Sequence, residues 1–141
     1  MCGVSGIIYK TGFPDKNKII SMNGMISHRG PDQSGYLEYK NLLLGHVRLS
    51  VLDITDKGRQ PMSVDGRYWI IFNGEVYNYN EIKDNLISKQ YKFFSQTDTE
   101  VVLNAFIEWG EECFKKFNGD WVIVILDKKT NKLLIARDGI G

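Results

Sequence analysis

A cysteine is the second residue of the chain, in the opening stretch MCGVSGIIYK, and removal of Met1 would make it N-terminal. Cys2 would then carry a thiol and a free α-amine, whose unperturbed pKa is roughly 7.7 to 8.0. A nucleophile needs a neighbouring base, and such an amine can accept the thiol proton without a separate histidine. Gly3, Ser5 and Gly6 would let a substrate or loop approach closely. Position alone leaves a buried structural cysteine equally open.

A second feature, the stretch IIFNGEVYNY, could stabilise negative charge. A thiol that attacks a carboxamide generates a negative oxygen, which needs fixed donors such as an Asn side-chain amide and a backbone N–H. Asn73 and Gly74 follow an apolar run, and the missing Cβ of Gly74 exposes its N–H. Because Asn-Gly is also a strong turn signal, a simple turn at the end of a strand is the alternative.

Two charged residues could hold the ends of a small amino-acid substrate. Arg48 lies inside a strand-like run, GHVRLSVLD, and its guanidinium fork suits a carboxylate. The alternative is that Arg48 extends from an edge strand to solvent. Asp98, in SQTDTE, could bind an ammonium group or could simply cap a helix.

The remaining reactive side chains are interpreted as structural. His28 and His46 have no evident orienting partner in the sequence, so neither is assigned a catalytic role. Cys113, in EECFKKF, has no complementary charge pattern around it and is predicted to be packed in a helix. With only two cysteines and no companions at ligand spacing, neither a disulfide framework nor a metal site is expected.

The composition describes an ordinary globular chain. Its 141 residues suit one domain, with 43% hydrophobic residues, 25% charged residues and a net charge of +1. This balance offers no excess charge for nucleic acid or an anionic membrane, so neither is expected as a partner. No apolar run of about 18 residues and no secretory signal is present, which predicts a cytoplasmic protein.

The periodicity of the first half predicts a strand, a helix and two further strand-like runs. Residues 3–9 form a glycine-interrupted strand, and residues 16–30 form a helix that Gly30 and Pro31 end, with Ile19, Met22 and Ile26 on one side. Aromatic and β-branched residues predict strands within 41–54 and 67–78.

The second half predicts two helices and a hairpin. One helix starts near Asn78 or Asn80, either of which could cap it. The next starts at Thr97, which has capping-box spacing to Glu100, and ends near Gly110. Strands at 120–127 and 132–138 flank a turn. Strands joined by hairpins, with helices in separate blocks, predict an α+β fold.

Seven stretches together carry a family resemblance. In order, they are MCGVSGII, SHRGPDQSG, RLSVLD, FNGEVYNY, TDTE, GDWVIVILD and ARDGIG. This ordered set covers almost the whole chain and resembles the class II glutamine amidotransferase domain of the N-terminal-nucleophile hydrolases. The phrases HRGPD, RLSVLD and NGEVYN look most like the N-terminal half of glutamine-hydrolysing asparagine synthetase.

The resemblance implies a fold and a set of roles. The fold would be a four-layer αββα sandwich, two antiparallel sheets between helices, which agrees with the α+β prediction. Cys2 would be the nucleophile, with its own α-amine as proton acceptor and donor. Asn73 and Gly74 would form the oxyanion hole.

The substrate contacts follow in the same way from the resemblance. Arg48 would hold the glutamine carboxylate, Glu75 and Asp98 would hold its amino group, and Val51 would lie along the substrate through its backbone. The segment HRGPDQSG is left out of the catalytic set and interpreted as a loop in which Pro31 stiffens a turn and Asp32 caps local amides.

The implied reaction hydrolyses L-glutamine to glutamate and ammonia through a thioester on Cys2. The ammonia would serve a synthetase domain or subunit that makes asparagine from aspartate with ATP. This chain contains no glycine-rich phosphate loop, so no cofactor is expected in it, and ATP and Mg²⁺ are implied only for the synthetase domain.

The resemblance also implies that the family domain continues beyond residue 141. Residues 1–141 are therefore expected to be a glutaminase domain that is incomplete at its C-terminus and lacks the synthetase domain. An unpaired sheet edge would favour self-association, so a homo-oligomer stays open. Two other functions also stay open: an amidotransferase for a sugar acid or peptide carboxylate, and a catalytically silent interaction module.

Overall fold

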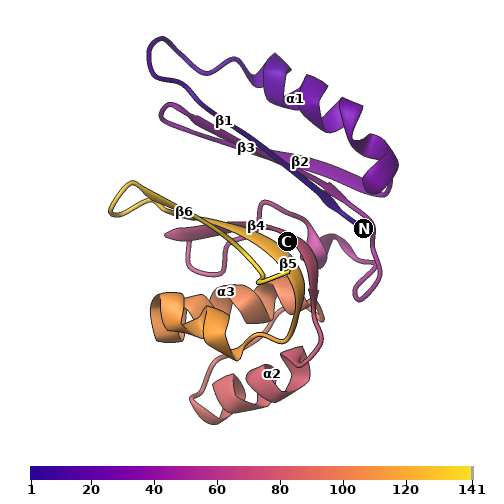
Figure 1. Ribbon diagram of the computed structural model, residues 1–141, viewed down its shortest axis with the longest axis vertical. Coiled ribbons are helices and arrows are strands. Elements are labelled where there is room, and N and C mark those ends of the chain that lie inside the picture. Colours follow the sequence, from indigo (N-terminus) through magenta and orange to yellow (C-terminus); the bar gives the residue numbers. More distant parts are fainter. Residues whose placement is uncertain (141) are drawn as a thin grey trace.

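The computed structural model describes residues 1–140 and has four layers in the order helix, sheet, sheet, helices (Figure 1). The helix α1 covers the outer face of one three-stranded sheet, and α2 and α3 lie beyond the other. The principal elements are β1 (Gly3–Ile8), α1 (Lys16–Met25), β2 (Gln33–Tyr39), β3 (Leu42–Arg48), β4 (Tyr68–Val76), α2 (Tyr79–Ser88), α3 (Asp98–Trp109), β5 (Gly119–Asp127) and β6 (Lys132–Arg137).

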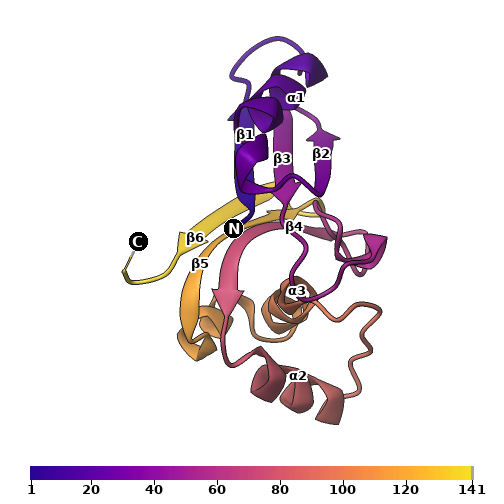
Figure 2. The same cartoon turned by 90° about the vertical axis from the view of Figure 1, so that its right-hand side faces the viewer.

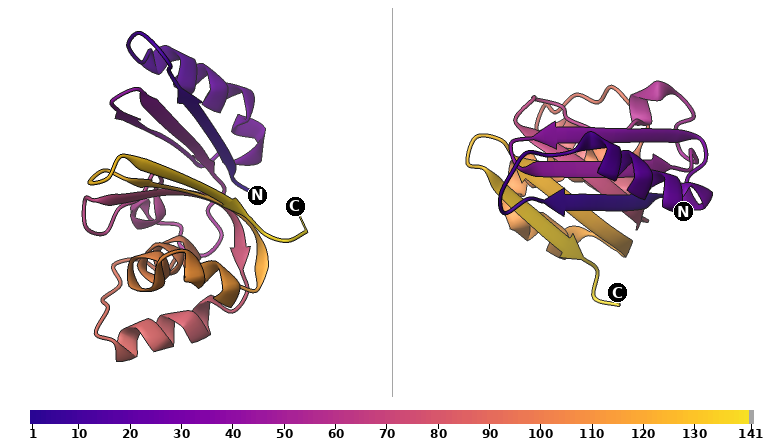
Figure 3. Two further views of the ribbon diagram at one scale, coloured as in Figure 1. Left: turned by 60° about the vertical axis from the view of Figure 1, so that its left-hand side comes forward. Right: turned by 90° about the horizontal axis from the view of Figure 1, so that it is seen from above.

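The first sheet has the order β1-β3-β2, with both pairings antiparallel. Its middle strand β3 is buried along its whole length, because α1 covers one face and the second sheet covers the other. Leu42 and Leu44 point toward the second sheet, while Leu43 and Val47 alternate with them toward α1. Figure 3 shows the two sheets stacked with α1 outermost.

The second sheet has the order β4-β5-β6 and is also antiparallel. Along β4, Ile70 and Phe72 contribute to the core under the helices, whereas Ile71 packs between the sheets. The helices supply the facing apolar residues, including Ile82 of α2 and Val102 of α3. Two apolar layers therefore flank the second sheet and fix its position in the sandwich.

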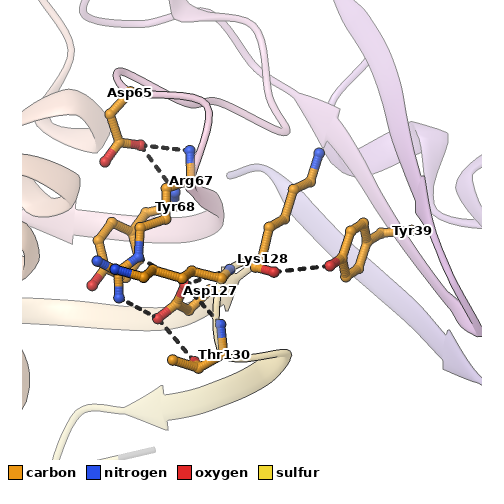
Figure 4. Close-up of polar contacts among 8 residues, drawn as sticks. Tyr39, Asp65, Arg67, Tyr68, Asp127, Lys128 and Thr130 are labelled. Carbon is orange, nitrogen blue, oxygen red and sulfur yellow. Dashed lines mark hydrogen bonds and ion pairs between the residues drawn. The ribbon is translucent and has the colours of Figure 1, made fainter.

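Polar contacts join the two sheets at the end remote from Arg48. The Tyr39 hydroxyl of β2 donates to the Lys128 carbonyl, 2.9 Å away, in the turn between β5 and β6 (Figure 4). Beside it, the Arg67 guanidinium donates two hydrogen bonds to Asp127, and this pairing lowers the pKa of the Asp127 carboxyl. The turn between β5 and β6 is thereby bonded to β2 of the first sheet, and the end of β5 is bonded to the residue before β4.

The structure confirms the α+β prediction and corrects several local details. β2 was not predicted as a separate strand. Helix α1 ends at Met25, and a short 3₁₀ turn, Ser27–Arg29, leads to Gly30. Asp32 does not cap a local amide: its Oδ2 accepts from the Ser50 N–H, 2.6 Å away and 18 residues later.

The helix caps are partly as predicted. Thr97 caps α3 by accepting from the Glu100 N–H, and Gly110, with φ of 59°, ends the helix. The Glu100 carboxylate does not return to Thr97 but accepts from the amides of Phe94 and Ser95. Asn78 is the first residue before α2, yet its side chain bonds residues 116 and 118 rather than the helix.

No helix within residues 1–140 combines the length and apolar character required to cross a membrane.

Candidate functional site

A pocket of about 240 Å³ opens at the end of the sandwich where β1 begins and β3 ends. Figure 2 shows the chain N-terminus beside the second sheet at this end. The pocket is smaller than the roughly 300–1,000 Å³ of sites for drug-sized molecules, so it suits a small ligand. Every predicted site residue except Asn73 lines it: Cys2, Arg48, Val51, Gly74, Glu75 and Asp98.

Cys2 is held at the mouth of this pocket by backbone contacts. The Leu49 N–H donates to Sγ at 3.4 Å, and Sγ lies 3.7 Å from the Leu49 carbonyl oxygen. The Arg29 Nε–H donates to the Cys2 carbonyl at 3.0 Å. Since Leu49 directly follows Arg48, the thiol and the guanidinium are placed by adjoining residues of one segment.

The outward edge of β4 supplies backbone donors to the pocket. In an antiparallel ladder, alternate residues direct N–H and C=O away from the partner strand. Ile70, Phe72 and Val76 do so, and their N–H groups are bonded by the Met62 carbonyl, the Gln60 side chain and the Asp98 carboxylate. Gly74 has the same orientation, and within residues 1–140 its N–H has no protein acceptor.

Gly74 needs to be glycine at this position. Its φ is 140°, which side-chain-bearing residues rarely adopt, and a Cβ would lie 2.1 Å from the Asp120 carbonyl oxygen. The structure excludes the alternative of a turn at this position, because Asn73 and Gly74 lie inside β4 and pair with β5. The result is a backbone N–H directed into the pocket.

Asn73 is the one predicted residue that does not line the pocket. It lies between Phe72 and Gly74 on β4, and its Oδ1 is buried without a hydrogen-bond partner within residues 1–140. Alternation places Asn73 on the same side of the strand as Ile71, which faces the first sheet. Its role as an oxyanion donor stays a prediction.

Arg48 is the last residue of β3 and is only 5% exposed. Its Nη1 donates to Gln33 Oε1 at 2.9 Å and to the Thr55 carbonyl at 3.0 Å, and its Nη2 donates to the Asp53 carbonyl. A guanidinium carries five N–H donors. Within the described chain, the Nε–H and one Nη2–H are left for a ligand.

Gly58 makes room for this guanidinium. A Cβ on Gly58 would lie 2.1 Å from Arg48 Nη2 and 2.4 Å from Arg48 Cζ. The guanidinium thus rests directly on the Gly58 backbone, and the surrounding carbonyls of residues 53 and 55 fix its plane. Arg48 does not extend from an edge strand to solvent, because β3 is the central strand of its sheet.

The opposite side of the pocket is acidic. Glu75 and Asp120 are directly opposite each other on β4 and β5, and Asp98 begins α3 nearby. Like charges at facing strand positions are unfavourable unless a cation lies between them. Burial raises the pKa of Asp98 from 3.8 to about 6, although its hydrogen bonds to the Val76 and Thr99 amides act in the other direction.

Sequence reasoning missed five polar residues of the pocket: Gln60, Tyr77, Thr97, Thr99 and Asp120. Pairing the stretch NGEVYN with GDWVIVILD would have placed Asp120 beside Glu75, so strand register was the available signal. The Tyr77 hydroxyl donates to Asp120 at 2.8 Å, and that bond raises the pKa of Tyr77. No sequence pattern marks Gln60.

None of the three residues interpreted as structural lines the pocket. Cys113 is fully buried in the core, and burial raises the pKa of its thiol to about 12. His46 is buried between the sheets, which lowers its pKa to about 4, and His28 is exposed. Residues 1–140 contain no cluster of three or more His, Cys, Asp or Glu side chains that could hold a metal ion.

Comparison with known proteins identifies the family of the chain. The glutamine amidotransferase domain family matches residues 1–141. Asparagine synthetase [glutamine-hydrolyzing] 1 and 3 of Bacillus subtilis are 41% and 38% identical over 146 residues; each match covers the whole chain but only 23% and 24% of those proteins. The chain thus spans about a quarter of the length of these relatives.

A solved structure shares the fold at low sequence identity. The glutamine phosphoribosylpyrophosphate amidotransferase of B. subtilis, complexed with ADP and GMP, superposes with a TM-score of 0.77 and 17% identity. The similarity covers 98% of this chain and 37% of that protein. The predicted arrangement of two sheets between helices is therefore confirmed.

Proposed function

The chain belongs to the glutamine amidotransferase domain family, and we propose that it is a glutaminase domain that hydrolyses the side-chain amide of L-glutamine. One observation supports this proposal above the others. A thiol, an acceptor-free backbone N–H, an arginine and a group of carboxylates line a single small pocket. A zwitterionic amino acid needs a cation at one end and carboxylates at the other, and this pocket offers both.

The proposed reaction starts at Cys2. After removal of Met1, the α-amine accepts the thiol proton, and the sulfur attacks the glutamine carboxamide carbon. The resulting oxyanion accepts from the Gly74 N–H and the Asn73 side-chain amide. Collapse of the tetrahedral intermediate, with the α-ammonium returning its proton to the leaving nitrogen, releases ammonia and leaves a thioester.

Water then completes the proposed cycle. The α-amine takes a proton from water as it attacks the thioester, and cleavage of the C–S bond releases glutamate and restores the thiol. Throughout, Arg48 holds the substrate carboxylate, Glu75 and Asp98 hold its ammonium group, and the Val51 backbone lies alongside. The acidic side chains bind the substrate and take no part in the proton transfers.

The ammonia has a proposed use outside this chain. The matched relatives are named as glutamine-hydrolysing asparagine synthetases, so we propose that ammonia passes to a synthetase domain or subunit acting on aspartate. ATP and Mg²⁺ belong to that domain in this proposal, and residues 1–141 act without a cofactor. Both cysteines are free thiols, which supports a location in the reducing cytoplasm.

The deciding experiment combines labelling with activity. The purified protein is weighed intact before and after incubation with a glutamine-like electrophile, and the labelled residue is mapped. Loss of Met1 and a single adduct on Cys2 are expected, together with release of glutamate and ammonia from glutamine. Cys2→Ala should abolish both, while the matched variant Cys113→Ala keeps both. Glutaminase activity that survives in Cys2→Ala would refute the proposal.

A further inference from the structure

We propose that Gln60 is a positioning residue that holds the oxyanion-binding edge of β4 at a fixed position relative to the start of α3. This inference rests on the proposed glutaminase function, since it concerns the same pocket. Gln60 is 4% exposed and contributes to the pocket wall, yet it belongs to the loop between β3 and β4 rather than to either element.

The two ends of the Gln60 carboxamide bind two different elements. Its Oε1 accepts from the Phe72 N–H at 2.6 Å, directly before Asn73 on β4. Its Nε2 donates to Thr99 Oγ1 at 3.1 Å, directly after Asp98 on α3. Since a backbone N–H can only donate, the carboxamide oxygen has to face Phe72, and this fixes the orientation of the whole group.

Gln60 also has a fixed backbone. A Cβ on Gly35 would lie 2.2 Å from the Gln60 carbonyl oxygen, so the loop rests directly on β2 of the first sheet. A single residue therefore contacts the first sheet through its main chain, and the second sheet and α3 through its side chain. The loop position, and not the strand alone, sets where Phe72 lies.

These contacts form a closed frame around the Gly74 N–H. On β4, the outward amide at Phe72 is bonded by Gln60, and the outward amide at Val76 is bonded by Asp98 at 3.3 Å. The amide of Gly74 lies midway between these two anchors. Because Gln60 also bonds the neighbour of Asp98, one carboxamide supports both anchors.

The carbonyl side of Phe72 is held as well. His46 Nε2 lies 3.0 Å from the Phe72 carbonyl oxygen, and burial keeps this imidazole neutral, with its Nε2–H donating. The N–H and the C=O of Phe72, which both point away from β5, are thus each hydrogen-bonded. Loss of Gln60 would free the N–H side and let the edge shift toward or away from Cys2, while the His46 contact would limit the shift.

The test separates kcat from KM. In Gln60→Leu both hydrogen bonds are lost. We expect kcat, calculated per Cys2 that the electrophile can label in a parallel sample, to fall by about tenfold or more. This loss is smaller than the 10²–10³-fold loss caused by removing an entire oxyanion donor. In Thr99→Val only the bond to α3 is lost. That variant should raise KM for glutamine by several-fold, through Asp98, and leave kcat within about twofold of wild type.

A matched control distinguishes positioning from general packing. Like Gln60→Leu, the variant Asn104→Leu replaces a buried carboxamide, but Asn104 belongs to α3 and does not line the pocket. Asn104→Leu should therefore keep the kcat and the KM of the wild type. Unchanged kcat in Gln60→Leu, or an equal loss in Asn104→Leu, would overturn the inference while leaving the glutaminase proposal intact. If Gln60→Leu does not fold, an unchanged KM in Thr99→Val overturns it instead. No Cys2-dependent activity in wild type would overturn both.

Discussion

Replacing Asp98 by Asn should make the protein more stable and less able to bind glutamine. Asp98 is 6% exposed, and burial raises its pKa from 3.8 to about 6. Because the folded state holds this proton more tightly than the unfolded chain, ionised Asp98 destabilises the fold at neutral pH. Asn keeps an acceptor for the Val76 N–H and removes the buried charge.

The magnitude follows from the shift of about two pKa units. Each unit corresponds to about 1.4 kcal/mol, so the ionised carboxylate costs at most about 3 kcal/mol at pH 7.5. Because folding raises the pKa of this acid, the free-energy cost of the ionised carboxylate grows as pH rises from about 4 to about 6 and is constant above that range. At pH 4.5 the same linkage leaves about 1 kcal/mol, roughly a third of the neutral value.

Thermal unfolding followed by circular dichroism measures this difference. At about 3 to 5 °C per kcal/mol for a chain of this size, Asp98→Asn should raise Tm by up to about 9 to 15 °C at pH 7.5, and by about a third as much at pH 4.5. Losing a charged hydrogen bond to the substrate ammonium, worth about 1.5–3 kcal/mol, should raise KM by roughly 10- to 100-fold. A Tm at or below that of wild type at pH 7.5 would refute the reasoning.

Three further outcomes are expected. Gly58→Ala should displace the Arg48 guanidinium, because the new Cβ would lie 2.1 Å from Nη2; steady-state kinetics should show KM for glutamine raised at least tenfold, and an unchanged KM would contradict this. Asp53 bonds Thr55, which lowers its pKa to about 2, so its stabilising effect should be full above about pH 4 and lost as pH falls toward 2. Urea titrations of Asp53→Asn and wild type should therefore converge at acid pH. Cys113, with its raised pKa, should react with a thiol reagent only when the protein unfolds, as kinetics of labelling in urea would reveal.

The strands that carry strong apolar patterns were predictable, and β2 was not. The runs ending in Arg48 and in NGEVYN contain consecutive large apolar residues, because each of those strands is buried between layers. The β2 sequence QSGYLEY is a half-exposed edge and shows little apolar signal of its own. Its strand conformation comes from pairing with β3, which local propensity does not contain.

The site was predictable where motif order carried the information. Arg48 and Asp98 each had an ordinary local interpretation, and only the fold shows that the end of β3 and the start of α3 meet at one pocket. Gln60 could not be found this way, since its partners lie 12 and 39 residues along the chain. A side chain that bonds remote backbone leaves no periodic trace in the sequence.

The row of bonded amides along β4 has a consequence for solubility. An edge strand with free N–H and C=O groups is a template on which another chain can add a strand, and proteins protect such edges. Here residues 60, 62 and 98 accept hydrogen bonds from the outward N–H groups on either side of Gly74. A strand of another chain therefore cannot form a continuous ladder along this edge. The Gln60 and Asp98 side chains, which line the pocket, therefore also protect this edge of β4 from aggregation by strand addition.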